Sequence, residues 1–333
     1  MKIAYIMYPG ACYMGDGDGT KMQANIWIEE LEKRGHYVER INPWGHYDWK
    51  SFDIVHVFGM GLWDYDIIHW GRQLNPNFVF SPIIDTNVPL WLYKMATFWG
   101  NRKLRLFSRN YALRKYRDDI KLFLARSEYE ASYFRKGYDV EESKISIVPL
   151  SFRTNQYDPT IPKEPFCMFA GTMAQPRKNV PALIEAAKKY GFRLILVGNK
   201  GNAKSEAKLR AQIGDHNNIE ITGFVSDEEL ISLYNRAKVF ALPSLNEGVG
   251  LVALEAAIHG CNIVITKNGG PKEYYDKGYV QLVNPNDIDD IGKAVLKAME
   301  DDTSQPKLRE KLLQEYDVKR CVDKLIDAYQ KIL

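Results

Sequence analysis

Two glutamates, Glu247 and Glu255, lie on either side of a glycine-rich turn and carry the clearest chemical pattern in this chain. The apolar run 239–242 before the turn predicts a buried strand, and 251–259 predicts a helix that begins where the turn ends. Since a helix rises about 1.5 Å per residue, eight positions span at most ~12 Å. That reach is comparable to a diphosphate with a sugar at each end.

The backbone between the two glutamates is suited to an anion. Glycines permit close approach, and free amides at the start of a helix attract negative charge. The candidate donors are Gly248, Val249, Gly250, Leu251 and Val252. On this interpretation Glu255 binds one sugar, the amides bind the phosphates and Glu247 binds the other sugar. The alternative is an ordinary strand–turn–helix unit with two solvated glutamates. It is weaker because Glu255 interrupts an apolar helical face, where a carboxylate costs energy.

The same stretch resembles the E-x7-E signature of retaining glycosyltransferases with the GT-B fold. The resemblance extends past the second glutamate to Gly260 and to the run 266–273, which reads TKNGGPKE. Upstream it includes Gly171, the pair Lys178-Asn179, Gly198, and Gly223-Phe224-Val225. It covers nearly the whole C-terminal half of the chain and is thinner in the N-terminal half.

The resemblance implies that two cations bind the donor diphosphate and neutralise the leaving group. Lys178 matches the family's lysine, whereas Thr172 stands where an arginine is usual, and we assign that arginine's role to Arg177. Two surface cations at a helix start are the alternative, although the positive end of a helix disfavours them. Gly171 belongs to the same donor-binding loop.

Base recognition and phosphate contact follow from the resemblance at three more places. Backbone groups of Phe224 or Val225 would meet the edge of the nucleobase, and Gly198 would flank it. Ordinary turns at strand ends are the alternative for both. Gly19 matches the glycine-rich loop whose amides face the donor phosphates. The expected donor is a UDP or GDP sugar, and no further cofactor is expected.

The acceptor side departs from the family. Many relatives carry a histidine after the strand that we predict at 78–82, and none of the six histidines falls there. Asp85 is the nearest polar candidate, and its alternative role is to cap the helix after Pro89. The pair Asp16-x-Asp18 mimics a metal-binding motif but precedes a helix of an open sheet. We therefore expect no metal, and we expect these acids to orient an acceptor hydroxyl instead.

Length and composition indicate a two-domain α/β protein. A chain of 333 residues exceeds one ordinary core. No apolar run approaches the roughly 18 residues of a membrane helix. The four cysteines lie far apart without metal-binding spacing, so we expect a cytoplasmic protein without disulfides.

Strand-like and helix-like runs alternate throughout, which predicts parallel sheets with crossover helices. The resemblance makes this a GT-B fold, with two Rossmann-like domains facing across a cleft. We expect an acceptor-side domain at 1–150, a linker at 151–165 and a nucleotide-sugar domain at 166–315. A final helix at 316–333 would cross back to the first domain. Predicted strands are 2–8, 37–41, 54–58, 78–82, 122–125, 145–148, 166–170, 193–197, 219–221, 239–242, 262–265 and 279–283. Predicted helices are 20–34, 62–74, 128–136, 179–189, 203–213, 227–236, 251–259, 287–299 and 318–333.

One segment has an unusual charge distribution. Residues 94–117 contain eight lysines and arginines, no acid, and interleaved aromatic residues. Such a segment suits a negatively charged membrane surface or an anionic acceptor. A helix with a solvated basic face is the alternative. Nothing else in the chain resembles a nucleic-acid module, so no nucleic-acid partner is expected.

Together these features predict transfer of a sugar from a nucleoside diphosphate sugar to the hydroxyl of a saccharide or lipid-linked acceptor, with retention of configuration. The usual roles of the family favour cell-surface polysaccharide or glycolipid synthesis, at the inner face of the membrane. Two alternatives stay open. One is a non-catalytic nucleotide-sugar-binding subunit of a polysaccharide assembly complex, and the other is a sugar-nucleotide epimerase with the same fold.

Overall fold

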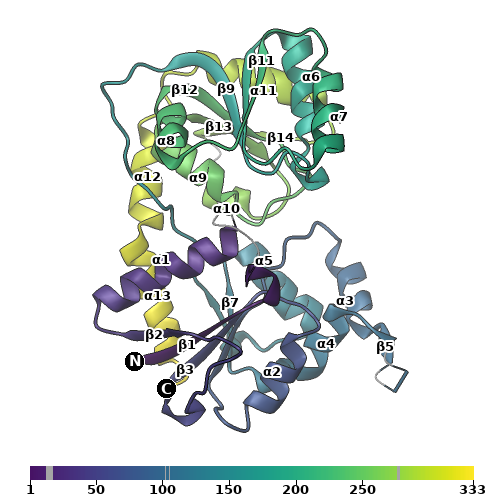
Figure 1. The fold of residues 1–333 in the computed structure, drawn as a ribbon, viewed down its shortest axis with the longest axis vertical. Helices are drawn as coiled ribbons and strands as arrows, with labels where there is room; N and C mark the ends of the chain where they lie inside the picture. Colours follow the sequence, from purple (N-terminus) through teal and green to yellow (C-terminus); the bar gives the residue numbers. More distant parts are fainter. Residues whose placement is uncertain (13–17, 102, 105, 276–277) are drawn as a thin grey trace. The chain divides into compact units, whose positions relative to one another are not determined.

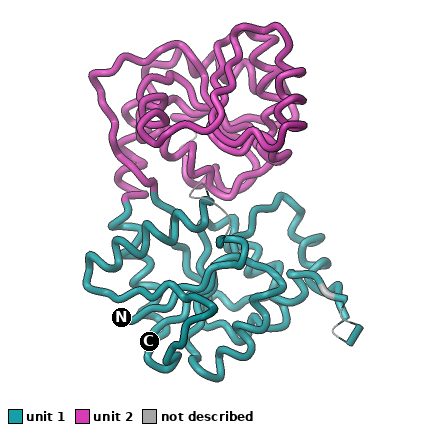
Figure 2. The backbone as a smooth tube through the Cα atoms, in the orientation of Figure 1, with its two compact units in different colours: residues 1–151, 318–333 teal, residues 152–317 magenta. Residues whose placement is uncertain are grey.

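A computed structural model describes residues 1–12, 18–101, 103–104, 106–275 and 278–333. The chain forms two compact units (Figure 2). Unit 1 contains residues 1–151 and 318–333, and unit 2 contains residues 152–317. Residues 152–165 therefore belong to unit 2, where the Lys163 ammonium donates to the carbonyls of Tyr234 and His259 at 2.9 and 2.7 Å.

Unit 1 is built on a parallel six-stranded sheet, whose strand order is β2-β1-β3-β4-β7-β8. The strands are β1 (Lys2–Met7), β2 (Tyr37–Arg40), β3 (Ile54–Phe58), β4 (Phe78–Ser81), β7 (Leu122–Ala125) and β8 (Ile145–Ile147). β3, β4 and β7 are buried along their whole length, which explains their largely apolar sequences. The sheet predicted for this half of the chain is thus observed, with strand ends within one residue of those expected.

The helices of unit 1 are more numerous than the sequence patterns predicted. They are α1 (Gly19–Lys33), α2 (Asp64–Gly71), α3 (Leu90–Phe98), α4 (Arg109–Tyr116), α5 (Glu128–Ser132) and α13 (Val318–Gln330). A π-turn, Tyr133–Gly137, continues α5 where one helix was expected over 128–136. Between α3 and α4 lies the short hairpin β5 (Gly100–Asn101) and β6 (Leu106–Phe107) (Figure 1). The basic segment 94–117 is therefore two helices and a hairpin.

A buried polar chain fastens α13 to the sheet of unit 1. Tyr329 on α13 lies 2.7 Å from Nδ1 of His56 and 3.1 Å from the Tyr5 hydroxyl, and Nε2 of His56 lies 2.8 Å from the Ser81 hydroxyl. Burial lowers the pKa of His56 well below its ordinary value, so its ring is neutral here. These contacts give His56 a role in packing within unit 1.

Unit 2 repeats the architecture, with the strand order β11-β10-β9-β12-β13-β14, all parallel. Its strands are β9 (Glu164–Ala170), β10 (Arg193–Val197), β11 (Ile219–Gly223), β12 (Ala237–Leu242), β13 (Asn262–Thr266) and β14 (Val280–Val283). Its helices are α6 (Val180–Tyr190), α7 (Ala203–Ile213), α8 (Asp227–Arg236), α9 (Leu251–Ile258), α10 (Pro271–Tyr274), α11 (Ile288–Glu300) and α12 (Lys307–Tyr316). α10 and α12 were not predicted.

Candidate active site

The strand order of unit 2 determines where a ligand can bind. From β9 the chain moves outward through β10 and β11, then returns to place β12 on the other side of β9. Helices leave β9 and β12 in opposite directions, so a crevice opens between their carboxyl ends, where ligands bind in open α/β sheets. The loops 171–179 and 243–250 follow these two strands. Both contain residues predicted from the sequence.

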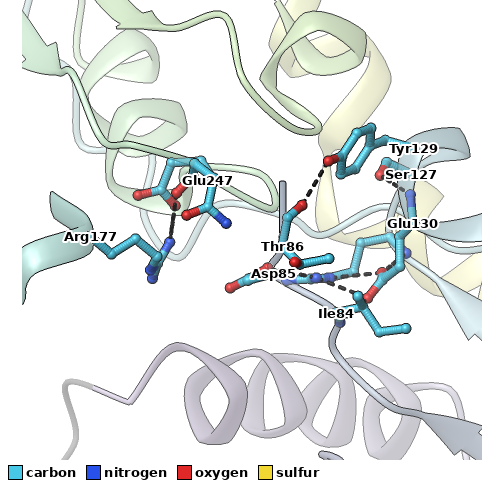
Figure 3. A network of polar contacts seen from close by, with 10 residues as sticks. Ile84, Asp85, Thr86, Ser127, Tyr129, Glu130, Arg177 and Glu247 are labelled. Atoms are coloured by element: carbon cyan, nitrogen blue, oxygen red, sulfur yellow. Dashed lines mark hydrogen bonds and ion pairs between the residues drawn. The ribbon is translucent and has the colours of Figure 1, made fainter. Parts of the chain in front are cut away.

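An ion-pair cluster joins the two loops at this point. The Lys178 ammonium lies 2.7 Å from Oε1 of Glu247, and a guanidinium nitrogen of Arg177 lies 3.1 Å from Oε2. The Ser244 hydroxyl donates to Oε1 at 2.7 Å. Glu247 is buried, with 5% of its surface exposed. Figure 3 shows the Arg177 side chain directed at this carboxylate. Three donors thus hold one buried carboxylate.

Asn179 explains why the lysine and arginine point at Glu247. It adopts the left-handed conformation (φ 55°) between a short 3₁₀ turn, Pro176–Lys178, and α6, and asparagine tolerates that conformation better than most residues. Its side-chain nitrogen Nδ2 donates to the backbone carbonyls of Pro243 and Pro285 at 3.0 and 2.7 Å. The asparagine of the Lys178-Asn179 pair is therefore the clamp that holds the two loops together.

Glycine 269 brings a third loop against the backbone of Glu247. The two residues form a parallel β-bridge, and the Gly270 amide donates to the Glu247 carbonyl at 3.1 Å. A Cβ on Gly269 would lie 1.9 Å from that carbonyl oxygen. Only glycine permits this approach, which accounts for the double glycine after β13.

The start of α9 presents unused backbone donors. Gly250 precedes the helix in the left-handed conformation (φ 82°). Among the described residues, no group accepts a hydrogen bond from the amides of Gly248, Val249, Gly250, Leu251 or Val252. Val249 and both glycines are buried. Buried amides without acceptors are rare in folded proteins, so these backbone groups are available to donate to an anion.

Glu255 has a partner that the sequence analysis missed. Arg153 holds it in a bidentate ion pair, with N–O distances of 2.7 and 3.2 Å. Glu255 is 3% exposed, and a second carboxylate, Asp227, lies 3.5 Å from the same guanidinium. The pairing leaves about one lone-pair position on each oxygen of Glu255. Arg153 was overlooked because it lies in the stretch interpreted as a linker.

The remaining predicted donor residues of unit 2 lie at the carboxyl ends of neighbouring strands. Gly171 follows β9 and Gly198 follows β10, and a Cβ on Gly198 would lie 2.3 Å from the Gly171 carbonyl oxygen. After β11, the Phe224 side chain is 79% exposed and Val225 is half-buried. The structure thus brings these residues to the same edge of the sheet as Lys178 and Glu247.

In unit 1 the glycine-rich loop also follows a strand at a reversal of strand order, between β1 and β3. Gly19 is the first residue of α1. Asp18 caps this helix by accepting from the Thr20 amide at 3.1 Å and also accepts from the Tyr8 hydroxyl. Both of its oxygens therefore have structural partners. Asp16 lies outside the described residues.

Asp85 belongs to a network rather than to a helix cap. It pairs with Arg126 at 2.8 Å, and Arg126 pairs with the buried Glu130 at 2.9 Å. Glu130 also accepts from the Ile84 amide at 2.6 Å (Figure 3). Burial opposes the charge of Arg126, but the two carboxylates outweigh it and raise its pKa. The N-cap of α3 is Pro89, so the capping role considered for Asp85 is wrong.

Arg126 and Glu130 were also missed, although a signal existed. They directly follow the predicted strand 122–125, and the carboxyl end of a parallel strand is where functional side chains gather. The adjacent Ile83 has a left-handed backbone (φ 60°), which is rare for a β-branched residue. The turn after β4 is therefore held in a costly conformation by its neighbours.

A cavity of about 250 Å³ lies beside this network within unit 1. Its polar lining comes from Asp85, Thr86, Tyr93, Arg109 and Asn110. Tyr93 and Asn110 are tied together through Tyr138, whose hydroxyl lies 2.8 Å from that of Tyr93 and 3.1 Å from the Asn110 side-chain oxygen. A cavity of this volume, with hydrogen-bonding groups set in a partly apolar wall, suits a sugar-sized group.

Within the described ranges, no group of three or more His, Cys, Asp or Glu side chains is arranged to hold a metal ion. In the same part of the chain, no helix combines the length and apolar character needed to cross a bilayer.

Comparison with known proteins places this site in a class. The chain superposes on the sucrose-phosphate synthase of Thermosynechococcus elongatus with a TM-score of 0.79, covering 99% of this chain and 98% of that one at 15% identity. It superposes on Anabaena HepE in complex with UDP with a TM-score of 0.73, covering 99% and 100% at 17% identity. The fold is therefore GT-B, as the sequence predicted.

Sequence comparison points to a family. Residues 152–315 match the family model described as "Glycosyl transferases group 1". The O-antigen chain mannosyltransferase B of Escherichia coli is 27% identical over 237 residues, which are 64% of this chain. Unit 2 is therefore similar in sequence to the group 1 glycosyltransferases. The chain spans 61% of the length of that mannosyltransferase.

Proposed function

We propose that this protein transfers a sugar from a nucleoside diphosphate sugar to an acceptor hydroxyl, with retention of the anomeric configuration. The observation that carries the proposal is the Lys178–Glu247–Arg177 cluster at the strand reversal of unit 2. It lies in the same loop as the unused amides of the α9 turn. Cations and amides together form a site for a diphosphate.

In this mechanism Lys178, Arg177 and the amides at 248–252 stabilise the charge that develops on the departing diphosphate. Preorganised donors of this kind supply several kcal/mol at a transition state. Glu247 neutralises one of the two cations while the donor is absent. Its Oε1 already accepts hydrogen bonds from Lys178 and Ser244, whereas its Oε2 is ion-paired with Arg177, so a lone-pair position on Oε2 remains to accept a sugar hydroxyl.

The other end of the donor is assigned to Glu255 and the base loops. Arg153 fixes the Glu255 carboxylate, and its remaining lone pairs accept the two ribose hydroxyls. Phe224 and Val225 meet the nucleobase, and Gly198 flanks it. A UDP or GDP sugar fits these assignments. We also assign to the Gly19 amide a hydrogen bond to the donor phosphates.

Asp85 and the cavity beside it are assigned to the acceptor. The side chain of Asp85 is 29% exposed and Arg126 holds it, so it is oriented to accept a hydrogen bond from a hydroxyl group. A saccharide or lipid-linked acceptor in polysaccharide or glycolipid synthesis is supported by the O-antigen relative. The family resemblance implies front-face attack, in which the donor phosphate receives the acceptor proton, so no enzymatic nucleophile and no metal is required.

The test is release of nucleoside diphosphate from a panel of UDP and GDP sugars, with and without saccharide and lipid-linked acceptors. We expect acceptor-dependent release and a product with the donor's anomeric configuration by NMR. Glu247→Gln should lose most turnover, while Asp85→Asn should lose acceptor-dependent release but keep donor binding. Donor binding without release under any condition would indicate a binding subunit. Conversion of the donor sugar without acceptor would indicate an epimerase. An inverted product would exclude the retaining mechanism.

A further inference from the structure

The apolar face of α3 points away from the core of unit 1. Tyr93 and Thr97 are the buried side chains of this helix. On the opposite side, five large apolar residues are 45–84% exposed: Trp91, Leu92, Met95, Phe98 and Trp99. The first four have the spacing i, i+1, i+4 and i+7, which places them on one helical stripe, and Trp99 follows directly as the C-cap of the helix. A helix that turns its apolar stripe to solvent has a partner.

The hairpin after α3 extends this surface. Leu104 and Leu106 are each 66% exposed, and Figure 1 shows the hairpin extending from unit 1 beyond α3 and α4. The Arg114 guanidinium lies 3.8 Å over the Phe98 ring, which fixes one side chain of the stripe. We call the exposed residues of α3 together with Leu104 and Leu106 the outer apolar surface.

Charge indicates what the partner is. Within residues 94–117 no acid occurs. Asp139, from a neighbouring element, pairs with Lys94 and Arg114. Lys103, Arg109 and Lys115 are exposed and have no ion pair among the described residues. Positive charge beside an apolar stripe complements an anionic lipid surface.

We infer that the outer apolar surface lies in the interface of an anionic lipid bilayer. The two exposed tryptophans suit the headgroup level, where Trp is enriched, and the basic side chains would contact the lipid phosphates. The same helix lines the cavity assigned to the acceptor, through Leu92 and Ala96. Docking would therefore bring that cavity beside the bilayer. Only the assignment of this cavity to the acceptor rests on the proposed function. Its position beside the bilayer would make the acceptor lipid-linked.

The experiment is co-sedimentation of the full chain with vesicles of phosphatidylcholine alone or mixed with phosphatidylglycerol. We expect binding to the anionic vesicles that is at least tenfold tighter and weakens with salt. The triple variant Trp91→Gln, Met95→Gln, Trp99→Gln should lose at least tenfold in affinity. The double variant Lys103→Ser, Lys115→Ser should lose roughly fivefold per residue on anionic vesicles and little on neutral ones.

Matched control variants distinguish loss of vesicle binding from other effects of substitution. Trp44→Gln removes a tryptophan that is 89% exposed elsewhere in unit 1, and it should leave binding unchanged. Glu247→Gln should also bind vesicles normally, so loss of activity and loss of docking are separable. Thermal melting followed by circular dichroism checks that each variant folds. Absence of vesicle binding, or equal binding by the triple variant, would overturn the inference. So would self-association in sedimentation velocity that the triple variant abolishes, since the surface would then join two copies of the chain.

Discussion

Lys178 Nζ lies 2.7 Å from Glu247 Oε1, although 69 positions separate the two residues in the chain. The first follows β9 and the second follows β12, and these strands are neighbours in the sheet only because the strand order reverses there. The contact explains how the site keeps a lysine and an arginine close together without a ligand. A buried carboxylate between them removes most of their mutual repulsion.

Lys178→Ala should lower turnover by roughly 10²–10³, because it removes one preorganised donor to the leaving diphosphate. The measurement is initial-rate release of nucleoside diphosphate at saturating donor and acceptor. Lys208→Ala is the matched control, since Lys208 is an exposed lysine of α7 in the same unit. Similar losses in both variants, or none in either, would remove the assigned role of Lys178.

Gly269→Ala should weaken donor binding, in addition to the destabilisation that a side chain causes at a positive φ. Its Cβ would collide with the Glu247 carbonyl, so the loop carrying Glu247 must shift. Gly191→Ala provides the comparison, because Gly191 also has a positive φ (72°) but nothing within 4 Å of the added Cβ. Both variants carry a left-handed cost of about 1–2 kcal/mol. Only Gly269→Ala should also lose donor affinity in titration calorimetry, and equal affinities would contradict this.

Arg153→Lys should weaken binding of the nucleoside diphosphate by roughly tenfold, or ~1.4 kcal/mol. Lysine keeps the charge but cannot hold both oxygens of Glu255, so the carboxylate loses its orientation. Arg210→Lys is the control, because Arg210 donates to Glu206 through two nitrogens on the surface of α7. A double-mutant cycle with Glu255→Gln should show coupling between Arg153 and Glu255, whereas additive effects would show that the ion pair does not orient the carboxylate.

Arg126→Met should destabilise unit 1 by about 3–5 kcal/mol, because it leaves the carboxylate of Glu130 buried without its cation. Arg135→Met is the matched control. Arg135 pairs with Glu128 and Glu142, which are both exposed, and loss of such surface pairs costs about 0–1 kcal/mol. The chain has seven tryptophans, all at positions 27–99, so their fluorescence during urea unfolding reports unit 1 alone. Comparable losses for the two variants would show that the Glu130 network is not stabilising.

Asp64 should make the stability of unit 1 depend on pH. Burial raises the pKa of this carboxyl from 3.8 to about 6, although the Gly61 amide donates to it. The folded state therefore binds a proton more tightly than the unfolded state between these values. The contribution of Asp64 to the free energy of unfolding of unit 1 is therefore greatest below pH ~4. It is lost as the pH rises to about 6.

Asp64→Asn should abolish that pH dependence. Relative to the wild type, the variant should gain up to about 3 kcal/mol in free energy of unfolding between pH 4 and pH 7. Urea unfolding followed by tryptophan fluorescence at several pH values measures this. Asp66→Asn, an exposed position on the same helix, should track the wild type. A constant difference between Asp64→Asn and the wild type across the range would contradict the prediction.

Much of the fold could be read from local patterns. Largely apolar runs such as Ile54–Phe58 and Arg193–Val197 are strands with the expected bounds, because both faces of a parallel sheet are buried. α12 was missed although Leu308, Leu312 and Tyr316 repeat every four residues and are buried. α10 has only four residues and begins with proline, so it offers too little periodicity to detect.

By itself, the sequence determined the alternation of strands and helices, the glycine-rich turn between Glu247 and Glu255, and the lysine and arginine before α6. These depend on neighbouring residues and on the stereochemistry of glycine and asparagine. The tertiary structure alone decided that Arg153 holds Glu255 across 102 positions, that Arg126 and Glu130 support Asp85, and that α3 turns its apolar stripe outward. Each of these depends on which strands become neighbours and which helix face meets the sheet. Neither the choice of neighbouring strands nor the helix face that meets the sheet is encoded in the spacing of residues along one segment.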